Sequence, residues 1–212
     1  MKRIVFFGDS ITDMNRTKGE DPARDMGVGY PNFIAGELGC SNPNTYEFVN
    51  RGISGNTTVD LYARIKTDVW NLSPDILSIL IGVNDVWHGL DAANGVEIDR
   101  YERMYRMIIE DTKKRFPNVT LVMCEPFVLK GSATAGSEER WQQFCEVKEY
   151  AKVVKRLAAE YGAHFVPLQE KFDELAAKDG ADNYLFDGVH PVAAGAKVIA
   201  EEWVKVFRNA VQ

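Results

Sequence analysis

The chain alternates short, largely apolar runs with longer segments of helical periodicity. The apolar runs are rich in Val, Ile, Leu and Phe and show no alternation with polar residues, which is typical of strands covered on both faces. These predicted strands are residues 3–8, 46–50, 76–81, 119–124 and 164–167. The pattern therefore predicts a parallel sheet with helices packed on both of its faces.

Three segments repeat apolar residues at steps of three and four positions, as amphipathic helices do. They cover residues 101–116, 147–161 and 192–207. Pro117 follows the first of them directly. Because strands alternate with helices, we expect right-handed crossovers and an α/β fold, a three-layer α/β/α sandwich. No internal repeat, low-complexity tract or linker interrupts the 212 residues, so we expect one domain over 1–212.

Charge and the amino terminus narrow the function classes. Lys and Arg total 25 against 31 Asp and Glu, a net charge of −6, which argues against a nucleic-acid partner. The apolar run after Met1-Lys2-Arg3 is too short for a signal-peptide core, and no stretch has the length of a membrane span. We therefore expect a cytoplasmic protein without a membrane partner. Its three cysteines form no CxxC pair and are expected to be reduced, partly buried thiols.

Four loops carry chemically useful side chains. Loops 8–13, 50–57 and 82–88 follow predicted strands, and loop 186–191 precedes the last predicted helix. In open α/β sheets, ligands bind at the carboxyl ends of the strands. We therefore expect the functional residues to meet in these loops.

The loop before the last helix contains an acid and a histidine three positions apart. Asp187 and His190 stand just before Pro191, which suits the first turn of a helix. A carboxylate on one imidazole nitrogen would orient His190 as a general base. Solvated capping residues are the alternative. A metal site has less support, because His88 and His164 show no ligand spacing with His190.

The other loops offer a nucleophile and hydrogen-bond donors. Ser10 follows the first strand and needs a partner base to act as a nucleophile, although it or Asp9 would equally cap the next segment. The chain has no G-x-S-x-G elbow and no dinucleotide-binding fingerprint. Gly55 and Asn84 suit an oxyanion hole, or are simply turn residues.

Taken in order, the segments Phe-Gly-Asp-Ser-Ile-Thr, Ser-Gly-Asn-Thr, Gly-Val-Asn-Asp and Asp-Gly-Val-His-Pro resemble the four signature blocks of the SGNH hydrolases, the GDSL esterase/lipase family. Ile replaces Leu in the first block, a conservative departure. The resemblance implies a flavodoxin-like fold with a five-stranded parallel sheet. It also implies that Ser10 is the nucleophile, that Asp187 and His190 complete the triad, and that Ser10, Gly55 and Asn84 form the oxyanion hole. No metal or organic cofactor is implied.

Segments 50–57 and 81–87 are similar to those of intracellular acetylxylan and oligosaccharide acetylesterases, which implies a serine esterase acting on acetylated xylo-oligosaccharides or related sugars. An aromatic face suits a sugar ring, so Trp87 is a candidate substrate contact, or else a core residue. Asp9, Asp13 and Asp85 would hydrogen-bond sugar hydroxyls or hold the loops together. Loop 130–137 is expected to rim the pocket.

Two other functions remain open. A lysophospholipase, thioesterase or arylesterase would use the same triad, but a long acyl chain needs an extended apolar groove, and no amphipathic helix dedicated to lipid is evident. A non-catalytic carbohydrate-binding module would not need the complete set of five catalytic positions. Members of the family often associate, so a homo-oligomer is a further expectation. The expected partner is otherwise a small-molecule or oligosaccharide ester.

Overall fold

The computed structural model describes residues 1–210 and contains a five-stranded parallel sheet of order β2-β1-β3-β4-β5. The strands are β1 (Lys2–Gly8), β2 (Tyr46–Gly52), β3 (Ile76–Leu80), β4 (Thr120–Cys124) and β5 (His164–Val166). Each predicted strand is present, with ends within two residues of those expected. β2 runs on to Gly52 because it pairs with β1 to the end, where Gly8 lies opposite Gly52.

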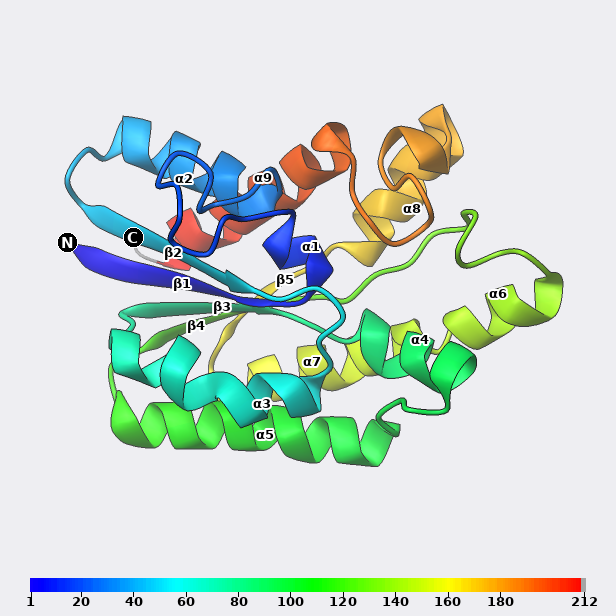
Figure 1. Ribbon diagram of the computed structural model, residues 1–212, viewed down its shortest axis with the longest axis horizontal. Helices are drawn as coiled ribbons and strands as arrows, with labels where there is room; N and C mark the ends of the chain where they lie inside the picture. The colour runs from blue at the N-terminus through cyan, green and yellow to red at the C-terminus, as the bar shows by residue number, and fades with distance from the viewer. Residues whose placement is uncertain (211–212) are drawn as a thin grey trace.

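Helices cover both faces of this sheet, as the apolar runs predicted (Figure 1). The longer helices are α2 (Tyr30–Ser41) and α9 (Ala193–Ala210) on one face, and α3 (Thr58–Asp68), α5 (Ile98–Arg115) and α7 (Val147–Tyr161) on the other. The α/β sandwich is therefore confirmed. Short elements complete the chain: α1 (Ser10–Asp13), η1 (Trp70–Leu72), α4 (Val83–Ala92), α6 (Glu138–Phe144), α8 (Gln169–Asp179) and η2 (Ala181–Asn183).

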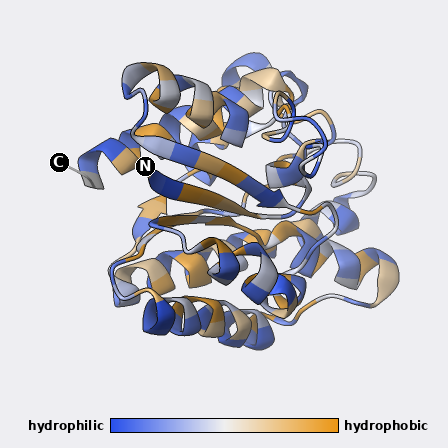
Figure 2. Ribbon diagram, turned by 60° about the vertical axis from the view of Figure 1, so that its left-hand side comes forward, coloured by the Kyte–Doolittle hydropathy of each residue, from blue (hydrophilic) through white to orange (hydrophobic). Residues whose placement is uncertain are grey.

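The core lies between the sheet and these helix layers. Four consecutive residues of β1, 4–7, are fully buried, which explains why the strand carries no polar alternation. Apolar residues colour the strands and the inward faces of the helices in Figure 2. One buried polar contact ties α9 to the sheet: the Trp203 indole N–H donates to the Ser78 hydroxyl of β3 at 2.9 Å.

One local expectation is wrong. Pro191 does not lie in the first turn of the last helix, because α9 begins two residues later, at Ala193. Pro191 instead pairs with Leu185 in an isolated antiparallel bridge, and the Phe186 N–H donates to the His190 carbonyl at 3.1 Å. The segment carrying Asp187 and His190 is therefore a closed loop, held at its base by backbone pairing.

Two expectations concern the surface and the thiols. No helix within residues 1–210 is long and apolar enough to cross a membrane. The three cysteines are unpaired, but they differ in exposure: Cys124 is buried, Cys145 is intermediate and Cys40 is exposed, so the expectation of uniformly part-buried thiols is wrong for Cys40.

Candidate active site

Ser10 is placed by a tight turn between β1 and α1. Asp9 caps the helix, since its carboxylate accepts the Ile11 N–H at 2.9 Å, and Ser10 is the first helical residue. Gly8 is needed just before this cap, because a Cβ there would lie 2.4 Å from both the Leu80 carbonyl oxygen and the Thr12 hydroxyl. The turn therefore holds the Ser10 side chain at the carboxyl edge of the sheet.

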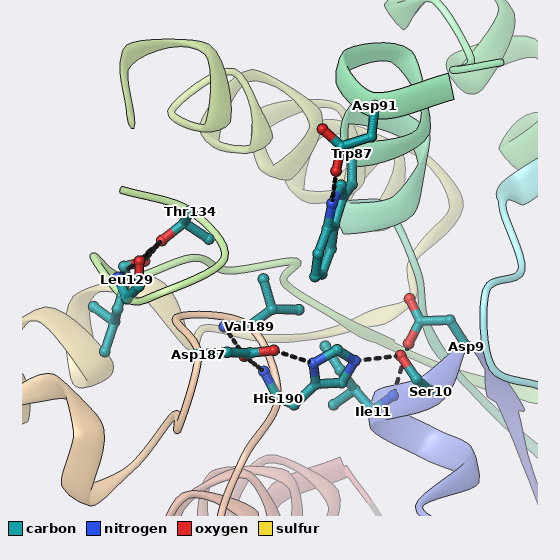
Figure 3. Close-up of polar contacts among 11 residues, drawn as sticks. Asp9, Ser10, Ile11, Trp87, Asp91, Leu129, Thr134, Asp187, Val189 and His190 are labelled. Carbon is teal, nitrogen blue, oxygen red and sulfur yellow. Dashed lines mark hydrogen bonds and ion pairs between the residues drawn. The ribbon is translucent and has the colours of Figure 1, made fainter. Parts of the chain in front are cut away.

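Ser10, His190 and Asp187 form a continuous hydrogen-bonded line (Figure 3). Ser10 Oγ lies 2.9 Å from His190 Nε2, and His190 Nδ1 lies 2.7 Å from Asp187 Oδ2. The other oxygen, Asp187 Oδ1, accepts the backbone N–H groups of Val189 and His190 at 2.9 and 2.8 Å. One carboxylate oxygen thus fixes the loop while the other orients the imidazole, as the three-residue spacing predicted.

The surroundings of this hydrogen-bonded line shift the pKa values of His190 and Asp187 in opposite directions. The hydrogen bond that His190 Nδ1–H donates to Asp187 raises the pKa of His190 above its ordinary value, against the opposing effect of burial. Burial alone would raise the pKa of Asp187, but hydrogen bonds from the His190 side chain and from the loop backbone outweigh it, so its pKa is lowered. A charged Asp187 beside a readily protonated His190 is the arrangement that lets a serine lose its proton.

The loop that carries Asp187 is supported from behind by residues 129–134. The N–H of Leu129 donates to the Gly188 carbonyl at 2.9 Å, and the N–H of Ala133 donates to the Asp187 carbonyl at 3.0 Å. The buried Thr134 hydroxyl in turn donates to the Leu129 carbonyl at 2.6 Å. Loop 130–137 was expected to rim the pocket. It contributes no residue to the cavity described next, and instead supports the loop that carries Asp187.

A cavity of about 460 Å³ opens over Ser10. Its described lining residues are Ser10, Ser54, Gly55, Asn84, Trp87, His88, Asp91, Ala92 and His190. The structure therefore brings together Ser10, Gly55, Asn84, Trp87 and His190, which come from four different loops. His88 and Asp91 were not anticipated here; Asp91 lies one helical turn after Trp87 on α4, and His88 is the residue next to Trp87.

Gly55 and Asn84 flank Ser10 on the wall of this cavity. Gly55 has a φ of +82°, which favours glycine, in the turn after β2. Asn84 lies in the first turn of α4, and its amide nitrogen donates one hydrogen to the Asn56 carbonyl at 3.0 Å. A second amide hydrogen remains. Among residues 1–210, the backbone N–H groups of Ser10 and Gly55 donate to no protein acceptor. Three donors thus remain available beside Ser10.

The three candidate substrate-binding aspartates are buried and lie outside the lining of the cavity. Asp13 accepts the N–H and hydroxyl of Ser54 at 3.1 and 3.2 Å, and Asp85 accepts the N–H and hydroxyl of Thr58. Asp9, Asp13 and Asp85 are at most 7% exposed, and none of them lines the cavity. Burial raises the pKa of Asp9 and of Asp85 to about 7. These contacts favour loop support, the alternative that the sequence left open, over contact with a substrate.

Two aromatic rings flank the His190 imidazole. Trp87 is partly exposed on the cavity wall, with its ring centroid 5.9 Å from that of His190. Phe186 stacks on the imidazole at 5.7 Å and an interplanar angle of 19°, with 56% of its surface exposed. Phe186 was not singled out from the sequence, although it directly precedes Asp187 in the last motif. An exposed aromatic beside that motif was the available signal.

Metal ligation has no support from the geometry of residues 1–210, where no group of three or more His, Cys, Asp or Glu side chains is placed to hold an ion. His88 lines the same cavity as His190, whereas His164 lies on β5. The polar side chains that line the cavity are the hydroxyls of Ser10 and Ser54, the imidazoles of His88 and His190, the Asn84 amide and the Asp91 carboxylate. Such a set suits acyl transfer.

Comparison with known proteins agrees with this geometry. The sequence model of the GDSL-like Lipase/Acylhydrolase family matches residues 6–198. An acetylxylan esterase of Geobacillus stearothermophilus is 34% identical over 211 residues, which cover 96% of this chain and 93% of the esterase.

Solved structures give the same result. The crystal structure of that acetylxylan esterase superposes with a TM-score of 0.85 at 33% identity, covering 97% of this chain and 93% of that chain. A GDSL-like lipase structure from Parabacteroides merdae superposes with a TM-score of 0.90 at 35% identity, covering 97% and 94%. The chain thus belongs to the GDSL-like lipase/acylhydrolase family and is a carboxylic ester hydrolase.

Proposed function

We propose that this protein removes acetyl groups from xylo-oligosaccharides or related sugars through an acyl-serine intermediate. The observation that carries the proposal is the hydrogen-bonded line Ser10–His190–Asp187, which opens into a cavity with free donors from Gly55 and Asn84. A nucleophile, a base, an orienting carboxylate and oxyanion donors at one point are the requirements of ester hydrolysis.

The chemistry follows from the atoms in this line. Ser10 Oγ attacks the ester carbonyl carbon while His190 Nε2 takes the hydroxyl proton. The resulting oxyanion accepts hydrogen bonds from the Ser10 and Gly55 N–H groups and from the Asn84 amide. His190 then gives its proton to the leaving alcohol as the C–O bond breaks. Water, deprotonated by the same imidazole, adds to the acyl-serine and releases the acid and Ser10. Asp187 keeps Nδ1–H in place throughout.

The cavity lining favours a short acyl group on a hydroxylated alcohol. The apolar side chains in the lining are Trp87 and Ala92, so the apolar surface of the cavity is small and forms no extended groove, and polar side chains stand beside it. A long acyl chain would need an extended apolar surface on which to bury itself, since each Å² of apolar surface removed from water stabilises the complex by about 25 cal/mol. The acetylxylan esterase of G. stearothermophilus supports the same choice of substrate class. A lysophospholipase or thioesterase has correspondingly less support.

Three esters test the proposal on the wild type: a small acetyl ester, a long-chain acyl ester and acetylated xylo-oligosaccharides. We expect activity on both acetyl substrates, and Ser10→Ala should lower kcat by about 10⁵- to 10⁶-fold, the scale expected when a catalytic nucleophile is removed. Ser41→Ala, which removes an exposed hydroxyl at the end of α2, is the matched control and should keep full activity.

Rapid quenching followed by intact-mass analysis should find one acetyl group on wild-type protein and none on Ser10→Ala. Full activity in Ser10→Ala, or no wild-type activity on any of the three esters, would overturn the mechanism. Preference for the long chain would overturn the substrate class alone.

A further inference from the structure

The Trp87 indole is fixed as a wall of the cavity. Its ring lies 5.9 Å from His190 and packs edge-on against the fully buried Phe144 ring of α6, at 5.5 Å and 74°. In the proposed mechanism His190 delivers its proton to the leaving alcohol, so groups beside the imidazole flank that alcohol. Trp87 therefore lies beside the position expected for the sugar ring.

The indole N–H of Trp87 is held by a charged pair. It donates to Asp91 Oδ2 at 2.7 Å, one helical turn further along α4 (Figure 3). Arg140 of α6 reaches across and donates to both oxygens of Asp91, at 2.7 and 3.0 Å. The Arg140 hydrogen bond lowers the pKa of Asp91, so Asp91 remains an ionised acceptor. A two-pronged contact of this kind restricts orientation more than a single hydrogen bond does.

Arg140 is itself fixed at two further points. Its Nε donates to the Ala133 carbonyl at 2.7 Å, and its guanidinium lies 5.1 Å from the Phe144 ring centroid. Trp87, Asp91, Arg140 and Phe144 therefore form a closed ring of contacts between α4 and α6. The same Ala133 binds the Asp187 carbonyl through its own N–H. The cavity wall and the triad loop thus share one support.

We propose that Asp91 and Arg140 are positioning residues, which hold the Trp87 indole as the surface against which the sugar ring of the leaving alcohol packs. This inference rests on the proposed deacetylation of sugars and adds the residues that determine its specificity. Neither Asp91 nor Arg140 needs to touch the reacting atoms. Their effect reaches the substrate through the orientation of one aromatic ring.

The test compares Asp91→Ala with the wild type on acetylated xylo-oligosaccharides and on a small acetyl ester. Since an exposed ion pair contributes about 0.2–1 kcal/mol, which is a factor of about 1.4 to 5, we expect KM for the oligosaccharide to rise by that factor. KM for the small ester should rise less than KM for the oligosaccharide, because the small ester has no sugar ring to pack against Trp87. Asp91→Asn keeps an acceptor for the indole N–H, so its KM for the oligosaccharide should lie between those of the wild type and Asp91→Ala.

A second set of variants, made in Trp87→Phe, separates an effect of Asp91 on the Trp87 indole from a general loss of structure. Trp87→Phe keeps an aromatic ring but has no N–H, so Asp91→Ala should cause little further change in KM when added to it. Acrylamide should quench the tryptophan fluorescence of Asp91→Ala more than that of the wild type, and this difference should vanish in the Trp87→Phe background. Glu47→Ala breaks the Arg3–Glu47 pair, of similar exposure, at the opposite edge of the sheet and should change neither quantity.

The outcomes distinguish this proposal from the one on which it rests. An unchanged KM in Asp91→Ala, with the wild type active on acetylated sugars, would overturn the positioning role alone. An equal rise in KM for both substrates, or an undiminished effect in the Trp87→Phe background, would do the same. Absence of wild-type activity on acetylated sugars would overturn both proposals.

Discussion

Substitution of Gly131 by alanine should damage the active site without touching any residue in it. Gly131 lies in the loop that supports the triad aspartate, where backbone meets backbone. A Cβ at this position would lie 2.2 Å from both the Asp187 carbonyl carbon and the Gly188 nitrogen, and 2.4 Å from the Asp187 oxygen. No side chain can rotate away to relieve these contacts, so one of the two loops must move.

The size of that movement sets the expected loss. Non-bonded carbon atoms pack at about 3.5–4.0 Å, so the loops must separate by more than about 1 Å. Overpacking of this kind typically costs about 1–3 kcal/mol of stability. A displacement of about 1 Å at Asp187 would misalign His190, and misplacement on that scale lowers the rate by about 10²-fold.

The assay is hydrolysis of a small acetyl ester, measured well below the melting temperature of each variant so that unfolding does not contribute. Gly136→Ala is the control: it lies in the same loop, and its Cβ would meet only Cδ of Arg140, at an ordinary contact distance of 4.0 Å. We expect Gly131→Ala to lower both kcat and Tm, and Gly136→Ala to change neither. If Gly131→Ala kept the kcat and Tm of the control, the argument that this loop positions Asp187 would be wrong.

Three further predictions concern acid–base chemistry, the oxyanion hole and the core. Hydrolysis requires neutral His190, whose pKa is raised by Asp187, so kcat/KM should fall as the pH drops through a value above the ordinary pKa of histidine. Asp187→Asn should move that limb to lower pH in a pH–rate profile, besides lowering the maximum. Asn84→Ala should lower kcat by about 10²- to 10³-fold, with little change in KM, in steady-state kinetics. Ser78→Ala should cost about 1–3 kcal/mol in urea unfolding, because it leaves the buried Trp203 N–H without its acceptor; unchanged stability would contradict that assignment.

Much of the fold is legible in local patterns. The largely apolar runs of β1 and β3 reflect strands that are buried on both faces, and this requirement acts on each residue separately. The apolar stripe of α5 likewise follows from the helical repeat, with Tyr101, Tyr105 and Ile108 all fully buried. Strand ends were less certain, because the extension of β2 to Gly52 depends on pairing with a different segment.

The candidate site also contains one contact that is local in sequence and one that joins distant segments. Asp187 and His190 are three residues apart, so their contact is a property of one turn and was predicted from spacing. The contact between Ser10 and His190 joins residues 180 positions apart, and only the shared edge of a parallel sheet brings them together. That meeting was expected from topology and from the resemblance to a known family, but its 2.9 Å geometry belongs to the folded chain.

The sequence by itself determined the class of fold, the loops that carry the chemistry and the family of esterases to which the chain belongs. These depend on residue periodicity and on short motifs, which are local. Only the tertiary structure decided which way ambiguous side chains turn. It buried Asp13 and Asp85 as loop supports, left Trp87 on the cavity wall, and placed Gly131 against the backbone of Asp187. Burial and close approach arise between segments distant in sequence, so no local pattern encodes them.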